Sequence, residues 1–254
     1  MKQNEESILE YDALIVVTAK DFERVQSQYH RLAANLPVRR IFFVGNEEVA
    51  QLVQNAGLGE KVGFLDENAV LPFEAVHAVM KDALRDVLDG QELPRGITGW
   101  YYQQFLKMQY ARMCDDAYYL VWDGDTIPCA PFSMFKEGTC VPYLDMKHEY
   151  YPQYFDTMAK LIPDLHKCFE KSFISEHMLM NSEIMRELLL EIEAGQNIAG
   201  ESFWEKIIHA IDAKGLQENS FSEFETYGTY VAMRRPESYR LRDWHSFRYG
   251  GVFY

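Results

Sequence analysis

Residues 12–19 read DALIVVTA, a short and continuous run of apolar, largely β-branched side chains that is typical of a buried strand. The stretch at 20–36, KDFERVQSQYHRLAANL, has apolar residues at helical spacing, and IFFVG at 41–45 is again strand-like. The pattern repeats, with a helix expected at 47–57, a strand at 61–66 and a helix at 73–88. Strands that are apolar on both faces and alternate with helices predict an α/β fold with a doubly wound, mostly parallel sheet.

The rest of the chain keeps this alternation only as far as residue 128. A long helix is expected from about 98 to 114, and YYLVW at 118–122 is the fourth strand. Beyond it we expect a strand at 140–146, helices at 182–195 and 203–211, and an extended segment at 225–233, which is an α+β pattern. No internal repeat or linker-like stretch divides the chain. We therefore expect one domain over 1–254, with a sheet-forming half at 10–128 and a second half at 129–254.

The charge of the chain excludes some partners. Lysine and arginine number 25 against 39 acidic residues, which gives a formal net charge of −14. Proteins that follow nucleic-acid phosphates need a basic surface, so we expect no nucleic-acid partner. The longest apolar runs are far shorter than the roughly 18 residues of a membrane span, and the N-terminal MKQNEESILEYD is unlike a secretory signal. These features predict a cytoplasmic protein without a membrane span.

The fourth strand ends in Asp123-Gly124-Asp125. Two carboxylates one residue apart can converge on a hard cation, and the glycine between them permits many backbone conformations. The same residue types are common in ordinary turns, so the tripeptide alone does not decide between a turn and a site. Its position favours a site, because ligands of doubly wound sheets bind beyond the carboxyl ends of the strands.

A phosphate ligand would have to be held without the usual glycine-rich loops, because neither GxGxxG nor GxxxxGK[ST] is present. A divalent metal on the two aspartates could bridge the oxygens of a diphosphate. The C-terminal region offers a second means, because His245 stands among arginines, whose guanidinium groups suit phosphate oxygens. These arginines are Arg234, Arg235, Arg240, Arg242 and Arg248. A basic, solvated tail explains the same composition.

The helix expected before the fourth strand carries polar groups on one face. Gln103, Gln104 and Lys107 follow Trp100 by three, four and seven positions, and therefore share its side of the helix. Polar side chains on a face that should be buried indicate a binding role. The alternative is that Lys107 extends its ammonium group to water beside buried aromatic residues.

Three further clusters hold groups that can move protons or bind hydroxyls. They are Glu176 with His177, then Glu223 with Glu225 and Tyr227, and finally Asp145 with Lys147, His148 and Tyr151. A single histidine is more often a core or surface residue than a functional one, so these clusters are weaker candidates than the aspartate pair.

Taken together, these residues make the chain resemble a GT-A glycosyltransferase, an enzyme class that uses nucleotide sugars. The resemblance rests on the apolar strand followed by Asp123-Gly124-Asp125, similar to the DXD motif of that class, on the alternating lead-in from Asp12, and on the late His245. The segment GWYYQQFLK at 99–107 is similar to bacterial enzymes of capsule, lipopolysaccharide and exopolysaccharide assembly. The resemblance covers residues 10–250 and implies a GT-A-like, Rossmann-like sheet with an acceptor-side second half.

The resemblance also implies an activity and a set of site residues. The enzyme would transfer a hexose from a UDP-sugar to a hydroxyl of a saccharide or lipid-linked acceptor, and any association with the inner face of a membrane would come through that acceptor. Mn²⁺ or Mg²⁺ would be bound by Asp125 with Asp123 and His245. Donor contacts are expected from Thr18, Lys20, Asp21, Trp100, Gln104, Lys107 and Asp123. Acceptor contacts are expected from His148, Tyr151, His177 and Tyr227.

The catalytic base is not evident from the sequence. Glu225 is the first choice if a base exists, with Asp145 and Glu176 in reserve. Inversion or retention of the anomeric centre is therefore left open.

Other functions remain open as alternatives. A haloacid dehalogenase-like phosphatase would use Asp123 as a nucleophile in a DxDx[TV] motif, but here Thr126 occupies the free position, Ile127 the Thr/Val position, and the motif comes late in the chain. A sugar nucleotidyltransferase would need a glycine-rich loop after the first strand, which is absent. A non-catalytic binding protein on a transferase fold is the third alternative.

Overall fold

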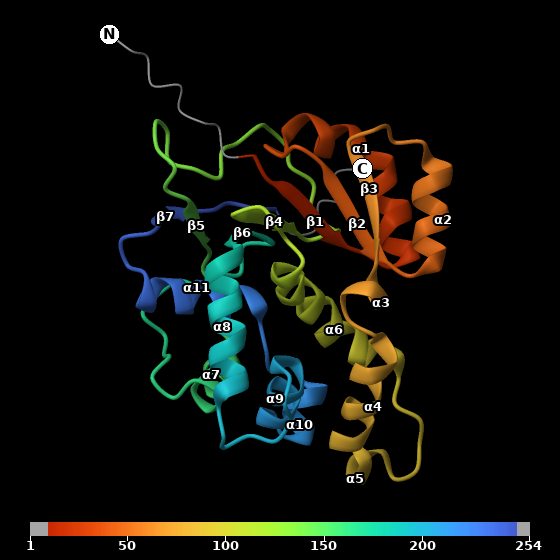
Figure 1. The fold of residues 1–254 in the computed structure, drawn as a ribbon, viewed down its shortest axis with the longest axis vertical. Helices are drawn as coiled ribbons and strands as arrows, with labels where there is room; N and C mark the ends of the chain where they lie inside the picture. Colours follow the sequence, from red (N-terminus) through yellow and green to blue (C-terminus); the bar gives the residue numbers. More distant parts are fainter. Residues whose placement is uncertain (1–9, 248–254) are drawn as a thin grey trace.

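The computed structural model describes residues 10–247 of the chain. Its centre is a five-stranded sheet in the order β3-β2-β1-β4-β6 (Figure 1). The strands are β1 (Asp12–Val16), β2 (Ile41–Gly45), β3 (Val62–Asp66), β4 (Tyr118–Trp122) and β6 (His177–Asn181). The first four are parallel and β6 runs antiparallel to β4. The mostly parallel α/β sheet is therefore confirmed, and β6 is a strand that the sequence pattern did not reveal.

Both faces of the sheet are buried. On one face, Ile15 of β1 and Trp122 of β4 join a core that includes Phe22 of helix α1. On the other face, Leu14 and Val121 join a larger core formed with helices of both halves. This two-sided burial explains why the strands are continuous apolar runs rather than alternating ones.

The helices of the first half follow the expected alternation. They are α1 (Ala19–Asn35), α2 (Glu47–Ala56), α3 (Glu67–Val70), α4 (Phe73–Ala83), α5 (Arg85–Leu88) and α6 (Arg95–Gln109). The single helix expected at 73–88 is interrupted at Leu84, whose backbone leaves the helical conformation. Helix α6 reaches the sheet edge where β4 ends, because its Lys107 contacts Asp123, the residue after β4.

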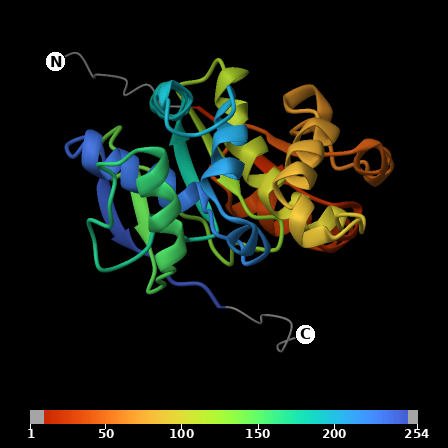
Figure 2. The ribbon, with the colours of Figure 1, turned by 90° about the horizontal axis from the view of Figure 1, so that it is seen from below.

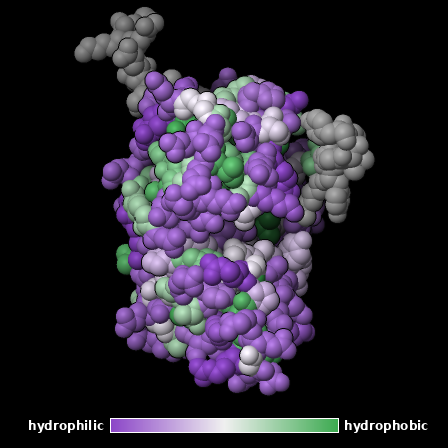
Figure 3. Space-filling model, turned by 90° about the vertical axis from the view of Figure 1, so that its right-hand side faces the viewer, coloured by the Kyte–Doolittle hydropathy of each residue, from purple (hydrophilic) through white to green (hydrophobic). Residues whose placement is uncertain are grey.

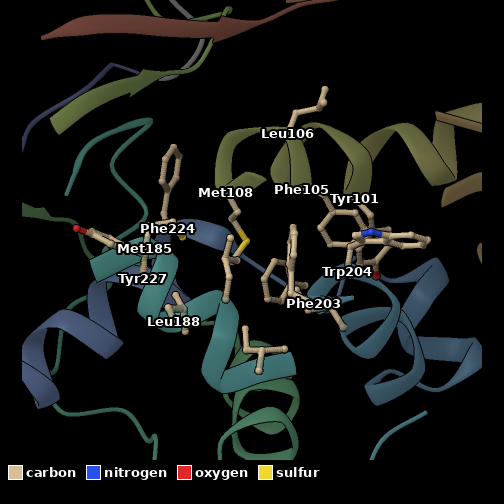
Figure 4. Packing of buried hydrophobic residues seen from close by; sticks show 14 of the residues in the cluster. Tyr101, Phe105, Leu106, Met108, Met185, Leu188, Phe203, Trp204, Phe224 and Tyr227 are labelled. Carbon is tan, nitrogen blue, oxygen red and sulfur yellow. The ribbon is translucent and has the colours of Figure 1, made fainter. Parts of the chain in front are cut away.

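Helix α6 lies between the sheet and the helices of the second half. Figure 4 shows Leu106 pointing toward the sheet, whereas Phe105 and Met108 point toward α8 and α9. All three side chains are fully buried. Because α6 is buried on opposite sides, any polar residue in its last turns must find partners inside the protein.

The second half packs helices and a small sheet against α6 and β6. Its helices are α7 (Pro152–Leu161), α8 (Ser182–Ala194), α9 (Phe203–Ala210), α10 (Ala213–Gln217) and α11 (Glu223–Arg234). Strands β5 (Tyr143–Met146) and β7 (Arg240–Asp243) pair in parallel as a separate two-stranded sheet. Figure 2 shows this small sheet on the side of the molecule opposite to α2 and α4. The α+β character expected for this half is present.

Helix α11 replaces the extended segment expected at 225–233, and that expectation was wrong. Its β-branched and aromatic residues favour strands locally, but nearly all of them are buried against the rest of the fold, and packing overrides propensity. The helix begins where the Ser222 hydroxyl accepts a hydrogen bond from the Glu225 N–H at 3.2 Å. Ser222 and Glu225 have the spacing of a capping box, a helix signal that was present in the sequence.

No helix within residues 10–247 is both long and apolar enough to cross a membrane. The face drawn in Figure 3 is mostly hydrophilic, and its hydrophobic residues form separate patches.

Candidate functional site

The candidate site lies at the carboxyl ends of β1 and β4. The order β3-β2-β1-β4 reverses direction between these two strands, because β2 follows β1 on one side and β4 lies on the other. Such a switch point opens a crevice beyond the strand ends, where doubly wound sheets bind their ligands. Thr18 follows β1, and Asp123 follows β4, so the sheet brings both predicted segments to the same edge.

The Asp123-Gly124-Asp125 segment is a tight turn. The backbone N–H of Thr126 donates to the Asp123 carbonyl at 3.0 Å, and Trp122 Nε1 donates to the Thr126 carbonyl at 2.7 Å. Asp125 is exposed, and within the described residues its only hydrogen bond is a long one from Thr126 Oγ1, at 3.5 Å. The turn chemistry considered as an alternative is thus real, and it presents the Asp125 carboxylate to solvent.

Lys107 is a buried lysine beside this turn, at 2% exposure. Its Nζ donates to Asp123 Oδ1 and to Glu223 Oε1, both at 2.7 Å, and lies 4.9 Å from the centre of the Phe224 ring. Burial lowers the pKa of Lys107, but the two carboxylates outweigh that effect and raise the pKa above its usual value. Lys107 is therefore a buried ammonium ion, and the alternative in which it reaches water is wrong.

Asp123 is itself affected by these neighbours. Burial raises the pKa of the Asp123 carboxyl to about 6, and the nearby Glu223 carboxylate acts in the same direction, while Lys107 opposes both. Its second oxygen, Oδ2, makes no hydrogen bond to any described residue. One oxygen of Asp123 is thus fixed by Lys107 and the other is available to a ligand.

Gln104 and Trp100 are the other two candidate donor contacts on α6. Gln104 is buried, and its Oε1 accepts a hydrogen bond from the backbone N–H of Glu223 at 3.0 Å. Gln104 and Lys107 therefore act together on the start of α11. Trp100 lies roughly 10 Å from Lys107 along the helix axis, at about 1.5 Å per residue, and its ring packs against Tyr101. The structure brings Gln104 and Lys107 to the site and leaves Trp100 two turns away.

The residues after β1 form a helix cap. Thr18 is the N-cap of α1, and its hydroxyl donates to Asp21 Oδ2 at 2.6 Å while accepting from the Asp21 N–H at 3.2 Å. Asp21 also pairs with Arg24. Thr18 and Lys20 are exposed at the same sheet edge as the turn. The start of a helix at this edge suits an anionic or hydroxyl-rich ligand.

Glu176 adjoins the turn from β6. Its carbonyl accepts the backbone N–H of Asp123 at 2.9 Å, and its φ of 63° is in the left-handed region, which residues with side chains seldom adopt. The Glu176 carboxylate pairs with Lys147, and Lys147 Nζ also donates to Ser246 Oγ at 2.8 Å. Glu176 thereby links the aspartate turn to the C-terminal segment.

Asp145, a reserve candidate for the base, is fully engaged in a buried network. Arg242 donates to both of its oxygens, at 2.5 and 2.7 Å, and His177 Nε2 lies 2.8 Å from Oδ2. Burial raises the pKa of Asp145, but the hydrogen bonds from Arg242 and His177 outweigh it and hold the pKa below its usual value. Asp145 is therefore a stably ionised partner in an ion pair rather than a proton acceptor.

Glu225, the first choice for the base, is buried on α11. Its Oε2 accepts hydrogen bonds from Ser172 Oγ at 2.5 Å and from the Phe173 N–H at 3.2 Å. Burial raises the pKa of Glu225, although the Ser172 hydroxyl opposes the shift. A raised pKa suits a general base, and the burial limits direct access to it.

The four expected acceptor contacts divide into two pairs. His177 and Tyr227 are buried: the His177 ring packs against Trp122 and Trp244, and the Tyr227 hydroxyl accepts a hydrogen bond from the Asn181 N–H at 2.7 Å. Neither side chain reaches the surface, so the structure does not place them where an acceptor could touch them. His148 and Tyr151 are exposed on the loop between β5 and α7.

The C-terminal segment does approach the end of β4. The Trp244 ring lies 4.4 Å from the His177 ring and 5.3 Å from the Phe132 ring, centre to centre, and both of these rings also contact Trp122. His245 itself is exposed. No group of three or more His, Cys, Asp or Glu side chains within residues 10–247 is arranged to hold a metal, so His245 does not join the aspartates.

Three arginines of this segment are engaged elsewhere. Arg234 pairs with Asp164 and Glu191, Arg235 with Glu187, and Arg242 with Asp145. Arg248 lies outside the described residues. Ion pairs within the second half therefore account for these three guanidinium groups, and the structure does not gather them for a diphosphate.

The two aspartates nevertheless fit a hard divalent cation. Asp123 Oδ2 and the Asp125 carboxylate supply oxygen ligands, and Mg²⁺ is typically held by one or two carboxylates together with substrate phosphates and water.

Glu223 also belongs to the site, through its ion pair with Lys107. The sequence named Glu223 only as a member of a cluster with Glu225 and Tyr227 and did not predict this contact. The signal for it was indirect: a lysine on a helix face that must be buried requires carboxylate partners.

Comparisons with known proteins place the fold. The structure resembles the crystal structure of mouse xyloside xylosyltransferase 1 in its apo form, with a TM-score of 0.50 and 15% sequence identity over 92% of this chain and 85% of that chain. This likeness supports a GT-A-like fold for the sheet and its helices. No curated protein sequence matches the chain. A family model matches residues 12–247, and the chain belongs to that family, the family of unknown function DUF6492.

Proposed function

We propose that the chain is a metal-dependent glycosyltransferase that moves a hexose from a nucleotide sugar, a UDP-sugar in the first instance, to a hydroxyl group of an acceptor. The observation that supports this best is the placement of Asp123 and Asp125 at the β1/β4 switch point of a GT-A-like sheet. The turn resembles a DXD motif and lies at the sheet edge where doubly wound folds bind their ligands. At 15% identity, the resemblance to a xylosyltransferase bears on the fold, and the function rests on the site.

The donor side of the proposed site is formed by the turn and the end of β1. Asp123, through Oδ2, and Asp125 would hold Mn²⁺ or Mg²⁺, with the remaining positions filled by diphosphate oxygens and water. When bound, the cation would neutralise the negative charge of the departing UDP. Thr18, Lys20 and Asp21 border the same edge and would contact the nucleoside.

The acceptor side is formed by the second half of the chain. The exposed residues His148 and Tyr151 lie on the loop that begins with Lys147, which is tied to Glu176 beside the turn. Glu225 would accept the proton of the attacking hydroxyl through an intervening water, because burial raises the pKa of its carboxyl and keeps the acceptor from direct contact with it. The acceptor would be a saccharide or lipid-linked glycan of the kind assembled in bacterial polysaccharide biosynthesis.

One experiment separates this proposal from its rivals. The chain is incubated with Mn²⁺ and a panel of UDP-, GDP- and CMP-sugars, and release of the nucleotide is measured with and without saccharide acceptors. We expect UDP release from one or a few UDP-sugars. Phosphate release from monoesters without sugar-dependent UDP formation would instead establish a phosphatase, and binding of a nucleotide sugar without turnover would establish a non-catalytic binding protein.

A further inference from the structure

Glu223 is held in place twice by helix α6. Gln104 accepts a hydrogen bond from its backbone N–H, and Lys107, one turn further along the same helix, donates to its Oε1. The Glu223 side chain is only 4% exposed. The carboxylate at the start of α11 therefore has one fixed position, which is set by two buried polar residues of α6.

Lys107 brings the carboxylates of Glu223 and Asp123 close together. Its Nζ lies 2.7 Å from an oxygen of each, so these two oxygens are within twice that distance of one another. Either carboxylate alone would neutralise the ammonium group. The second carboxylate leaves this trio with a net negative charge although Lys107 and Glu223 are both buried, and burying an extra charge is costly. Stability alone therefore does not explain why Glu223 is present.

We propose that Glu223 is a positioning residue that acts through Lys107 to keep the Asp123–Asp125 turn attractive to a divalent cation. This inference rests on the proposed function. Asp123, Asp125 and Glu223 contribute three negative charges and Lys107 one positive charge, so the site carries a net charge of minus two, which matches a dication. Without Glu223, Lys107 would pair with Asp123 alone and would cancel half of the charge of the two aspartates, which leaves a net charge of minus one.

Substitutions on the two sides of the Lys107–Glu223 pair should change the cation affinity in opposite directions. Glu223→Gln keeps the shape of the side chain and removes a negative charge, so Mn²⁺ binding should weaken by about ten-fold or more at this short range. Lys107→Met removes the positive charge, so binding should tighten. The double variant restores the net charge and should bind within a few-fold of the wild-type chain. A purely structural role of the pair predicts weaker binding in all three variants.

The test is isothermal titration calorimetry of Mn²⁺ into the full chain in the presence of UDP. Urea unfolding without metal shows that each variant is folded, and Lys107→Gln replaces Lys107→Met in the single and double variants if Lys107→Met does not fold. The matched control is Glu193→Gln, because Glu193 also accepts hydrogen bonds from a basic side chain, Arg112, and from a backbone N–H, at the far end of α8. Its Mn²⁺ affinity should equal that of the wild-type chain.

The outcomes distinguish the inference from the proposed function. Weaker binding in Glu223→Gln with recovery in the double variant supports the inference. Unchanged binding in Glu223→Gln, or a double variant no better than Glu223→Gln, overturns it while leaving the metal site intact. A wild-type chain that binds no Mn²⁺ with UDP contradicts the metal-dependent function and this inference together.

Discussion

Gly124 packs so closely on Val17 that a Cβ atom added to Gly124 would lie 2.7 Å from Val17 Cγ1. Real Cβ atoms do not approach other atoms this closely, and Val17 is buried directly after β1. The glycine of the Asp123-Gly124-Asp125 turn is therefore required by packing against the neighbouring strand. The same contact sets how far the two aspartates stand from the β1 edge of the site.

Gly124→Ala should destabilise the protein by about 1–3 kcal/mol, the usual range for overpacking a core, and should weaken UDP binding because the turn is displaced. Urea unfolding and titration calorimetry measure the two effects. Adding Val17→Ala removes the obstructing methyl group, so the double variant should lose less stability than the sum of the single variants. Strict additivity of the two changes would show that the contact does not constrain the turn.

Asp125→Ala should abolish the Mn²⁺-dependent increase in melting temperature that UDP produces. Asp125 is exposed, so its removal should change the free energy of unfolding by no more than about 0.5 kcal/mol. The loss would therefore report ligand binding rather than folding. Asp156→Ala, at another exposed aspartate on α7, is the control and should retain the full increase. An unchanged increase in Asp125→Ala would show that the turn is not the metal site.

Glu225→Gln should lower kcat by about 100-fold or more, the scale of a lost general base, with little change in the KM of the donor. The amide oxygen can still accept the hydrogen bond from Ser172, so the local structure should persist. Because burial raises the pKa of Glu225, the wild-type rate should fall as the pH drops through that pKa, and the variant should lack this acidic limb. A variant with full kcat would assign proton transfer to another group.

The sheet could be predicted from sequence because its determinants are local. Strands β1, β2 and β4 are short apolar runs buried on both faces, β3 is a partly buried apolar run, and the turn after β4 follows directly from Asp123-Gly124-Asp125. Parallel strands align their carboxyl ends, so the meeting of Thr18 with this turn also follows from the pattern alone. Strand β6 was not predicted, because HMLMN lies in a region without a clear helical or strand period in its apolar residues.

The partners of the charged residues could not be predicted, because they depend on contacts between distant parts of the chain. Lys107 and Glu223 are 116 positions apart, and Arg242 and Asp145 are 97 positions apart. Composition shows that arginines gather near the C-terminus, but only the fold shows that Arg242 is used by a buried aspartate. The charge pattern of a sequence thus identifies the charged side chains but does not show which of them form ion pairs.

The network of Asp145, Arg242 and His177 joins the two sheets of the protein. Asp145 belongs to β5, Arg242 to its neighbour β7, and His177 to β6 of the central sheet. The Asp145 side chain is 2% exposed, and neutralising this carboxylate would leave the Arg242 guanidinium without its anionic partner. Breaking a buried ion pair by removing one partner typically costs about 3–5 kcal/mol, and the partial exposure of Arg242 places this pair at the lower end.

Asp145→Asn should therefore lower the free energy of unfolding by about 3 kcal/mol at pH 7, and the difference from the wild-type chain should shrink in acid. The folded pKa of Asp145 lies below its usual value of 3.8, so its contribution is complete above that pH and is lost as the pH falls through the folded pKa. Urea midpoints at pH 7, 5 and 3 measure this convergence. A difference that is as large at pH 3 as at pH 7 would mean that the ionised carboxylate is not what stabilises the junction.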